Sequence, residues 1–303
     1  MTFFTVFFQM LALVIMIAAG VVATKTNLLD DHTATKLSPL IVNIFNPMLV
    51  LSSALEASGQ IPLPVLGTVG LVAFGMFFLF IVVGMMVTPF FSQDPQQRQL
   101  FQLMFVFSNL GFIGIPVVSS ILGPEFVVYV TEFLLVYNLI FYTYGVALME
   151  GRFSLSSLRS MCNFGNLVTI FSLIVIVFDL HLPDFVCTAV SYLGGATSPL
   201  ALVLVGYSLA CFPLKQLFTD RRLYLFSLIK LLLLPIAMLV GLKLLPVDPT
   251  LIPLFLVMFG MPVGNMPLML GTQKGIDCTV CSAGIIMTTL FCVVTIPLLI
   301  ALA

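Results

Sequence analysis

Long apolar stretches, separated by short polar or Gly- and Pro-containing stretches, run along the whole chain. They match the roughly 20 residues that an α-helix needs to cross a bilayer, whereas a transmembrane barrel would show short alternating segments. We therefore predict an all-α membrane protein with about ten spanning helices. Their approximate bounds, from run length and breaker residues, are 3–23, 36–56, 64–91, 97–122, 125–149, 162–180, 185–212, 220–244, 249–273 and 277–301.

Two of these predicted spans, the fourth and the ninth, are interrupted by helix-breaking residues. The fourth contains SNLGFIGIP from Ser108 to Pro116, and the ninth contains GMPVGNMP from Gly260 to Pro267. Proline lacks a backbone N–H and clashes with the preceding turn, and glycine lowers helix propensity. Non-helical backbone at membrane depth persists only where it is packed in protein or lines a cavity. Paired breaks in the two halves of a chain therefore predict the binding site of a transporter, near the midplane.

The composition agrees with a membrane protein and excludes other classes. The chain has 303 residues, of which 61% are hydrophobic and 8% are charged, whereas a soluble domain has roughly 25% charged residues. The net charge of -1 gives no indication of a nucleic-acid partner. No basic segment precedes the first apolar stretch, so we expect a retained helix there and not a signal peptide. Cys278 and Cys281 have no second ligand pair near them, and we expect neither a metal site nor a cofactor.

The distribution of Lys and Arg predicts the orientation. With the N-terminus outside and alternating spans, nine of the eleven fall in inner loops, Lys243 falls in an outer loop and Lys230 falls inside a span. The inner residues are Lys25, Lys36, Arg98, Arg152, Arg159, Lys215, Arg221, Arg222 and Lys274. Because basic loops stay on the cytoplasmic side, we predict that both termini are outside. The expected location is the cell membrane, most simply the bacterial inner membrane, with multiple passes.

An internal repeat divides the chain into two halves. The matching positions are Pro47 with Pro199 and Gly123 with Gly275, both 152 positions apart, and Asp94 with Asp248, 154 positions apart. A nearly constant offset indicates two five-helix units, residues 1–151 and 152–303. Five is an odd number, so the two units have opposite topology, and inverted repeats with broken helices are a common plan of secondary transporters.

The breaks are the first candidates for substrate binding. Each new half-helix begins with unpaired N–H groups and a partial positive charge, which attract an anion such as a carboxylate. Pro116 and Pro267 suit the first position of such a half-helix, and the amides of Asn109 and Asn265 can donate and accept hydrogen bonds there. The alternative is a pair of packing kinks in which the asparagines satisfy freed carbonyls. The predicted substrate-binding residues at the breaks are Asn109, Gly111, Gly114, Pro116, Pro262, Asn265 and Pro267.

Ionisable and polar residues inside other spans extend this set. Lys230 lies about ten residues into the eighth span, where a cation is costly and usually functional. We expect it to contact an anionic substrate, and the alternative is a side chain that extends toward the inner surface. Glu132 in the fifth span is a candidate proton carrier or an ordinary residue near the outer surface. Polar residues beside the prolines of the second and seventh spans either join helices or contact the substrate. These secondary candidates are Asn43, Asn46, Pro47, Thr197 and Ser198.

The two interrupted segments resemble those of a known family. SNLGFIGIP before a Gly-Pro-Glu turn, and GMPVGN before a Gly-x-Asp turn, are similar to helices 4 and 9 of the auxin efflux carrier family. That family includes the plant PIN carriers and bacterial permeases for malate and malonate. The resemblance implies two inverted five-helix repeats, with helices 4 and 9 crossing near the substrate. It also implies a scaffold of helices 1, 2, 6 and 7 that pairs two protomers, and a transport bundle of helices 3–5 and 8–10. In this alignment Asn109 and Pro116 belong to the first crossing helix, and Asn265 and its neighbouring prolines to the second.

We predict a secondary active transporter of small organic anions, carboxylates such as malate, malonate or auxin-like acids. It is expected to work by alternating access, as a homodimer in the lipid bilayer, with H+ and Na+ as candidate coupling ions. The alternatives are a sodium-coupled carrier of related fold and a membrane receptor or sensor that does not transport. An enzyme is not expected, because an intramembrane hydrolase needs a nucleophile–base pair or a metal cluster, and the sequence shows neither.

Overall fold

The computed structural model describes residues 3–59, 61–151, 163–212 and 220–302. Within these ranges every regular element is a helix, and one isolated antiparallel bridge joins Ser108 to Val263. Seven of the described helices are long and apolar enough to cross a membrane. Three shorter apolar helices lie in the predicted fourth, sixth and ninth spans, two of which are the interrupted ones. The prediction of an all-helical membrane protein is therefore confirmed.

Short turns divide many of the helices. The first part of the chain contains α1 (Phe3–Lys25), α2 (Asp31–Leu40), the π-helical turn η1 (Ile41–Phe45), α3 (Asn46–Ala57), α4 (Leu63–Phe91), α5 (Pro95–Val106), the π-helical turn η2 (Leu110–Gly114), α6 (Ile115–Ile121), the 3-10 turn η3 (Pro124–Phe126), α7 (Val127–Ile140), the π-helical turn η4 (Phe141–Gly145) and α8 (Val146–Glu150). The second part contains α10 (Phe164–Phe178), α11 (Asp184–Gly195), α12 (Thr197–Cys211), α14 (Arg221–Leu228), the π-helical turn η5 (Ile229–Leu233), α15 (Leu234–Lys243), the 3-10 turn η6 (Pro249–Leu251), α16 (Ile252–Phe259), α17 (Met266–Gln273) and α18 (Thr279–Ala301).

Three of the described π-helical turns end two residues before a proline. Pro47 follows η1, Pro116 follows η2 and Pro235 follows η5. Because a proline has no N–H to donate and its ring clashes with the preceding turn, a widened turn lets the helix continue through it. Pro199, the repeat partner of Pro47, lies instead in the first turn of α12. Helical N–H groups in a first turn have no intrahelical partner, so a proline is tolerated there.

The repeated Asp-Pro pairs both start helices. Asp94 accepts a hydrogen bond from the N–H of Gln97 at 3.0 Å, and Asp248 accepts one from the N–H of Thr250 at 2.9 Å. The proline that follows each aspartate suits the first helical position. Backbone and side-chain hydrogen bonds from Thr250 also hold the pKa of Asp248 below its usual value. Both matched aspartates therefore cap a helical segment, the α-helix α5 at Asp94 and the 3-10 turn η6 at Asp248.

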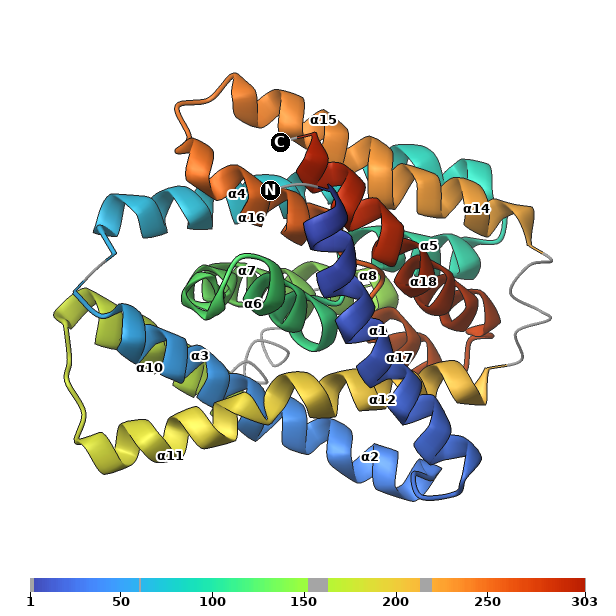
Figure 1. The fold of residues 1–303 in the computed structure, drawn as a ribbon. Coiled ribbons are helices and arrows are strands. Elements are labelled where there is room, and N and C mark those ends of the chain that lie inside the picture. Colours follow the sequence, from blue (N-terminus) through green and yellow to red (C-terminus); the bar gives the residue numbers. More distant parts are fainter. Residues whose placement is uncertain (1–2, 60, 152–162, 213–219, 303) are drawn as a thin grey trace.

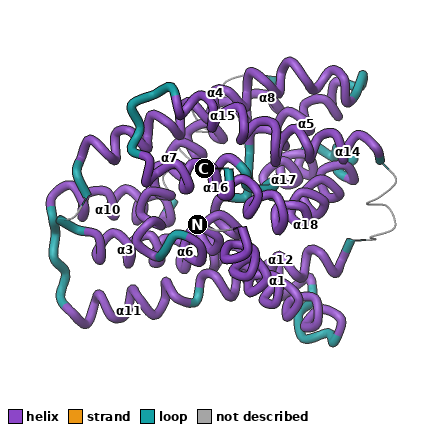
Figure 2. The backbone as a smooth tube through the Cα atoms, turned by 45° about the horizontal axis from the view of Figure 1, so that its top comes forward, coloured by secondary structure: helices purple, strands orange, loops and turns teal. Residues whose placement is uncertain are grey.

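Two long helical rods and α1 form one side of the molecule. The α11–α12 rod crosses the α2–α3 rod, and α1 lies along α12 (Figure 1). Both α10 and α11 pack on α3, while α4 packs on α5 and α7. Most non-helical backbone lies at the ends of helices, but one stretch lies inside the bundle beside α17 (Figure 2). This interior stretch holds the candidate site.

The contact between α1 and α12 depends on two glycines. A Cβ atom at Gly20 of α1 would overlap the carbonyl oxygen of Val203, and one at Gly206 of α12 would overlap the carbonyl oxygen of Ile17. The two backbones therefore approach more closely than larger residues would allow. Such contacts between small residues are typical of helix pairs in membranes, where close packing drives helix association.

Replacing Gly206 with alanine is expected to push these two helices apart. The usual cost of overpacking is about 1–3 kcal/mol of stability. Gly241 in α15 is the matched control, because a Cβ atom there would meet no atom within 4 Å. Thermal unfolding of both variants in detergent measures the difference, and an unchanged unfolding temperature for Gly206→Ala would contradict the tight contact.

Candidate functional site

The two interrupted helices lie against each other at their breaks. α5 ends at Val106, α16 ends at Phe259, and the unwound segments that follow are paired in antiparallel orientation. The N–H of Asn109 donates to the carbonyl of Pro262 at 2.7 Å, and the N–H of Gly264 donates to the carbonyl of Phe107 at 2.9 Å. Backbone N–H and C=O groups that have no helical partner at each break thus form hydrogen bonds with backbone groups of the other break.

The close pairing of the segments requires a glycine at position 264. A Cβ atom there would lie 2.9 Å from the carbonyl oxygen of Ser108 and 3.2 Å from that of Phe107. Both neighbours are backbone atoms, so they cannot rotate away as the end of a side chain could. Gly264 therefore sets the distance between the two segments.

The first half-helix restarts earlier than the sequence predicts. Asn109 is its N-cap, and its side-chain Oδ1 accepts a hydrogen bond from the N–H of Phe112 at 3.1 Å. The helix resumes at Leu110, so Pro116 is not at the first position and follows the π-helical turn η2. Pro116 is the second residue of α6, but it does not start the half-helix, because the capping Asn109 starts it at Leu110. Pro267 is the second residue of α17, within one residue of the prediction.

Lys230 lies behind the first break. Its side chain is fully buried, and Nζ donates to the carbonyl of Phe105 at 2.8 Å and to the hydroxyl of Ser108 at 2.9 Å. Nζ also lies 4.8 Å from the centre of the Phe80 ring, a cation–π distance. The Phe105 carbonyl is at the C-terminal end of α5, where the helix dipole favours a positive charge. The lysine therefore holds the end of α5 and the start of the unwound segment.

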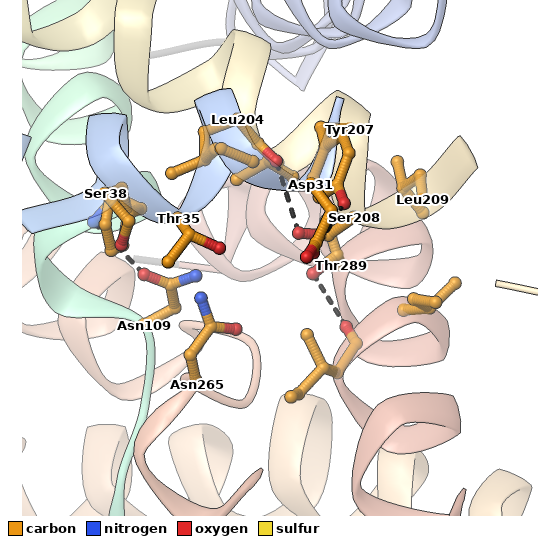
Figure 3. A pocket seen from close by; sticks show the side chains of 15 residues that line it. Asp31, Thr35, Ser38, Asn109, Leu204, Tyr207, Ser208, Leu209, Asn265 and Thr289 are labelled. Atoms are coloured by element: carbon orange, nitrogen blue, oxygen red, sulfur yellow. Dashed lines mark hydrogen bonds between the residues drawn. The ribbon is translucent and has the colours of Figure 1, made fainter. Parts of the chain in front are cut away.

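We call the paired segments 107–109 and 262–264 the crossing, and a cavity of about 200 Å³ lies beside it. Asn109, Asn265 and Phe112 of η2 form part of its wall, and residues of α2, α12 and α18 form the rest (Figure 3). Its polar side chains are Asp31, Thr35, Ser38, Asn109, Tyr207, Ser208, Asn265 and Thr289, and its apolar ones are Ala34, Phe112, Leu204, Val205, Leu209, Ile285 and Ile286. The cavity thus combines an apolar body with hydrogen-bonding groups, as is usual for a small-molecule site.

Comparison with known proteins identifies the family of this chain. The model of the membrane transport protein family matches residues 5–160 and 156–300, nearly the whole chain. The chain belongs to the membrane transport protein family. This is the auxin efflux carrier family that the two interrupted segments resemble, so that prediction is confirmed.

A curated relative points to the same class. An uncharacterized transporter of Methanocaldococcus jannaschii is 28% identical to this chain over 210 residues. The aligned part is 65% of this chain and 65% of the relative, so the chain spans just under two thirds of the relative's length.

The predicted substrate-binding residues fall into two groups around the crossing. Asn109 and Asn265 line the cavity. The other predicted residues are not among those that line it, and they form the structure around the crossing: Gly111, Gly114, Pro116, Lys230, Pro262 and Pro267. A Cβ atom added to Gly114 would lie 3.5 Å from the carbonyl oxygen of Asn109. This second group therefore belongs to the backbone and packing around the cavity and not to its lining.

The secondary candidates are distributed over several contacts. Asn46 is buried, its Nδ2 faces Gly111, and its Oδ1 has no hydrogen-bond partner among the described residues. The hydroxyl of Thr197 is also buried and unpartnered there. Asn43 donates to the carbonyl of Pro39 at 2.9 Å, within its own helix. Of the remaining candidates, Pro47 packs near Gly165, Ser198 is half-buried in α12, and Glu132 approaches Gly70 of α4.

The sequence did not predict six polar side chains of the cavity wall, one carboxylate and five hydroxyl groups. Asp31, Thr35 and Ser38 are spaced by four and three positions, so they lie on one face of α2. This periodicity is visible in the sequence and could have indicated a polar face at the start of the second helix, just before the predicted span 36–56. Tyr207 and Ser208 of α12 and Thr289 of α18 carry no such signal, because single hydroxyl residues are frequent in membrane helices.

Proposed function

We propose that this protein is a secondary active transporter of small organic anions, carboxylates such as malate, malonate or auxin-like acids. The observation that carries the proposal is the antiparallel pairing of the two breaks at a cavity lined by Asn109 and Asn265. The helix after each break begins at the crossing, and each N-terminus carries about half a positive charge. Two such termini and two side-chain amides are suited to one carboxylate. The cavity of about 200 Å³ suits a small acid.

The proposed orientation makes the cavity open toward the cytoplasm. Asp31 begins α2 directly after the short loop that follows Lys25, and Tyr207 and Ser208 lie near the end of α12. The positive-inside rule assigns both of these helix ends to the inner surface and both chain termini to the outer surface. In this orientation the structure corresponds to an inward-facing state of an alternating-access cycle.

We propose that the helices form two inverted halves, 1–151 and 152–303. The interrupted pairs α5 with η2–α6, and α16 with α17, would be the crossing helices of the two halves. The scaffold would consist of α1, α2–α3, α10 and α11–α12, through which two protomers pair in the cell membrane. The tight α1–α12 contact and the packing of α10 and α11 on α3 support one rigid unit. The remaining helices would move against it, coupled to H+ or Na+.

Replacing Asn109 or Asn265 with alanine is expected to lower carboxylate affinity and uptake about tenfold, the equivalent of one hydrogen bond to a charged group. Asn109→Ala also removes the cap of the restarted helix, so its effect should be the larger. Uptake of labelled malonate and malate by proteoliposomes, with a pH or sodium gradient imposed, measures both the transport and the coupling ion.

Asn43→Ala is the matched control for these variants, because the amide of Asn43 donates to its own helix and does not line the cavity. Uptake rates of Asn109→Ala and Asn265→Ala equal to those of Asn43→Ala would contradict a substrate site at the crossing. Binding without uptake under any gradient would favour a membrane sensor over a transporter.

A further inference from the structure

The cavity wall carries one charged side chain, Asp31, among the described residues that line it. Asp31 is the first residue of α2, and the hydroxyl of Tyr207 on α12 donates to its Oδ1 at 3.1 Å. Figure 3 shows this pair on one side of the cavity and Asn109 with Asn265 on the other. The hydrogen bond from Tyr207 keeps the carboxylate of Asp31 at the cavity although the residue is exposed to solvent.

Among the described residues that line the cavity, no positively charged side chain offsets the charge of Asp31. His32 and Lys36 belong to the same helix but are exposed and do not line the cavity. Asp30 is engaged as the N-cap of α2 and accepts a hydrogen bond from the N–H of Thr33 at 2.8 Å. Lys230 lies on the far side of the crossing, where it contacts the end of α5. The acidic side chain of Asp31 therefore faces the cavity, with the hydroxyl of Tyr207 as its hydrogen-bond donor.

The cavity consequently has two ends of opposite character. The crossing attracts an anion through two helix N-termini, whereas Asp31 repels one. A dicarboxylate bound at the crossing would place its second carboxylate toward Asp31. A carboxylate accepts up to about four hydrogen bonds, and Tyr207 occupies one position on Asp31. The positions that remain suit a hydrogen-bond donor, and best a positively charged one.

We propose that the cavity selects a small zwitterionic carboxylate, with its carboxylate at the crossing and its ammonium group toward Asp31. This inference rests on the proposed function: it keeps a carboxylate at the crossing, but it favours amino acids, in the broad chemical sense, over diacids such as malate and malonate. Asp31 is the residue that determines the preference, and Tyr207 positions it.

The test compares acids of equal length that differ only at one end. The probes are succinate against 4-aminobutyrate and glutarate against 5-aminopentanoate, bound to the purified full-length protein in detergent and followed by thermal shift. The wild type is expected to bind the amino acid of each pair more tightly than the diacid. Asp31→Asn should lower this preference about two- to fivefold, the range for a solvent-exposed charge pair.

Asp184→Asn is the matched control, because Asp184 is also an exposed first residue of a helix, α11, but lies outside the cavity. It should leave the preference unchanged. Tighter binding of the diacids by the wild type, or an unchanged preference in Asp31→Asn, would overturn the zwitterion proposal and leave carboxylate transport standing. If no member of any pair binds, the proposed function fails together with this inference. The wild-type comparison decides the question even if the Asp31 variant does not fold.

Discussion

Replacing Lys230 with glutamine is expected to remove most carboxylate binding and to leave a folded protein. The buried amine donates to Phe105 and Ser108, directly before the segment that carries Asn109. A carboxylate at this depth loses hydration, and two helix termini of about half a charge each offset only part of that loss. A protonated Lys230 would add a positive charge behind the crossing. We expect affinity to fall at least about tenfold, which corresponds to about 1.4 kcal/mol.

The control for this variant is Lys243→Gln, at the exposed end of α15. Lys230→Arg should retain part of the binding, because the two cations differ in shape and hydration. Lys230→Met, in contrast, leaves two buried acceptors without a donor and should cost about 1–3 kcal/mol of stability. If Lys230→Gln lowers the unfolding temperature but leaves ligand affinity unchanged, the lysine only holds the end of α5, and the charge of the anion is met elsewhere.

The sequence predicts the breaks well because their causes are local. Prolines and glycines disturb a helix wherever they occur, and both interrupted helices are found where the motifs SNLGFIGIP and GMPVGNMP lie. The restart of the helix at Leu110 is also a local effect, but two residues could start the helix, the capping Asn109 and Pro116. Asn109 caps the helix seven positions before Pro116, and a π-helical turn then accommodates the proline.

The surroundings of the breaks depend on contacts between segments that are distant in the sequence. The sequence alone does not show which segments meet. Lys230 is 122 positions from Ser108, and the contact exists because η5 lies beside the end of α5. Tyr207 reaches Asp31 across 176 positions in the same way. A charged residue in an apolar span signals that a partner exists, but only the packing of the helices identifies it. The polar wall of the cavity is therefore the part of the site that required the structure.

Replacing Gly264 with alanine is expected to abolish transport, through backbone geometry alone. The added methyl group would lie 2.9 Å from the carbonyl oxygen of Ser108, closer than carbon and oxygen atoms pack. The segments must then separate, which weakens the hydrogen bonds between Gly264 and Phe107 and between Asn109 and Pro262. Because both helix N-termini are positioned by this pairing, we expect carboxylate affinity to fall about tenfold or more, a loss of about 1.4 kcal/mol.

The matched control lies in the same crossing. A Cβ atom at Gly114 would be 3.5 Å from the carbonyl oxygen of Asn109 and 3.6 Å from Sδ of Met261, ordinary contact distances. Gly114→Ala should therefore keep its substrate affinity, whereas Gly264→Ala loses it, and ligand-dependent thermal shifts of both variants separate the two outcomes. Equal affinities would mean that the two N-termini need no fixed separation. The anion would then be held by the side-chain amides of Asn109 and Asn265 alone, and the breaks would serve packing rather than binding.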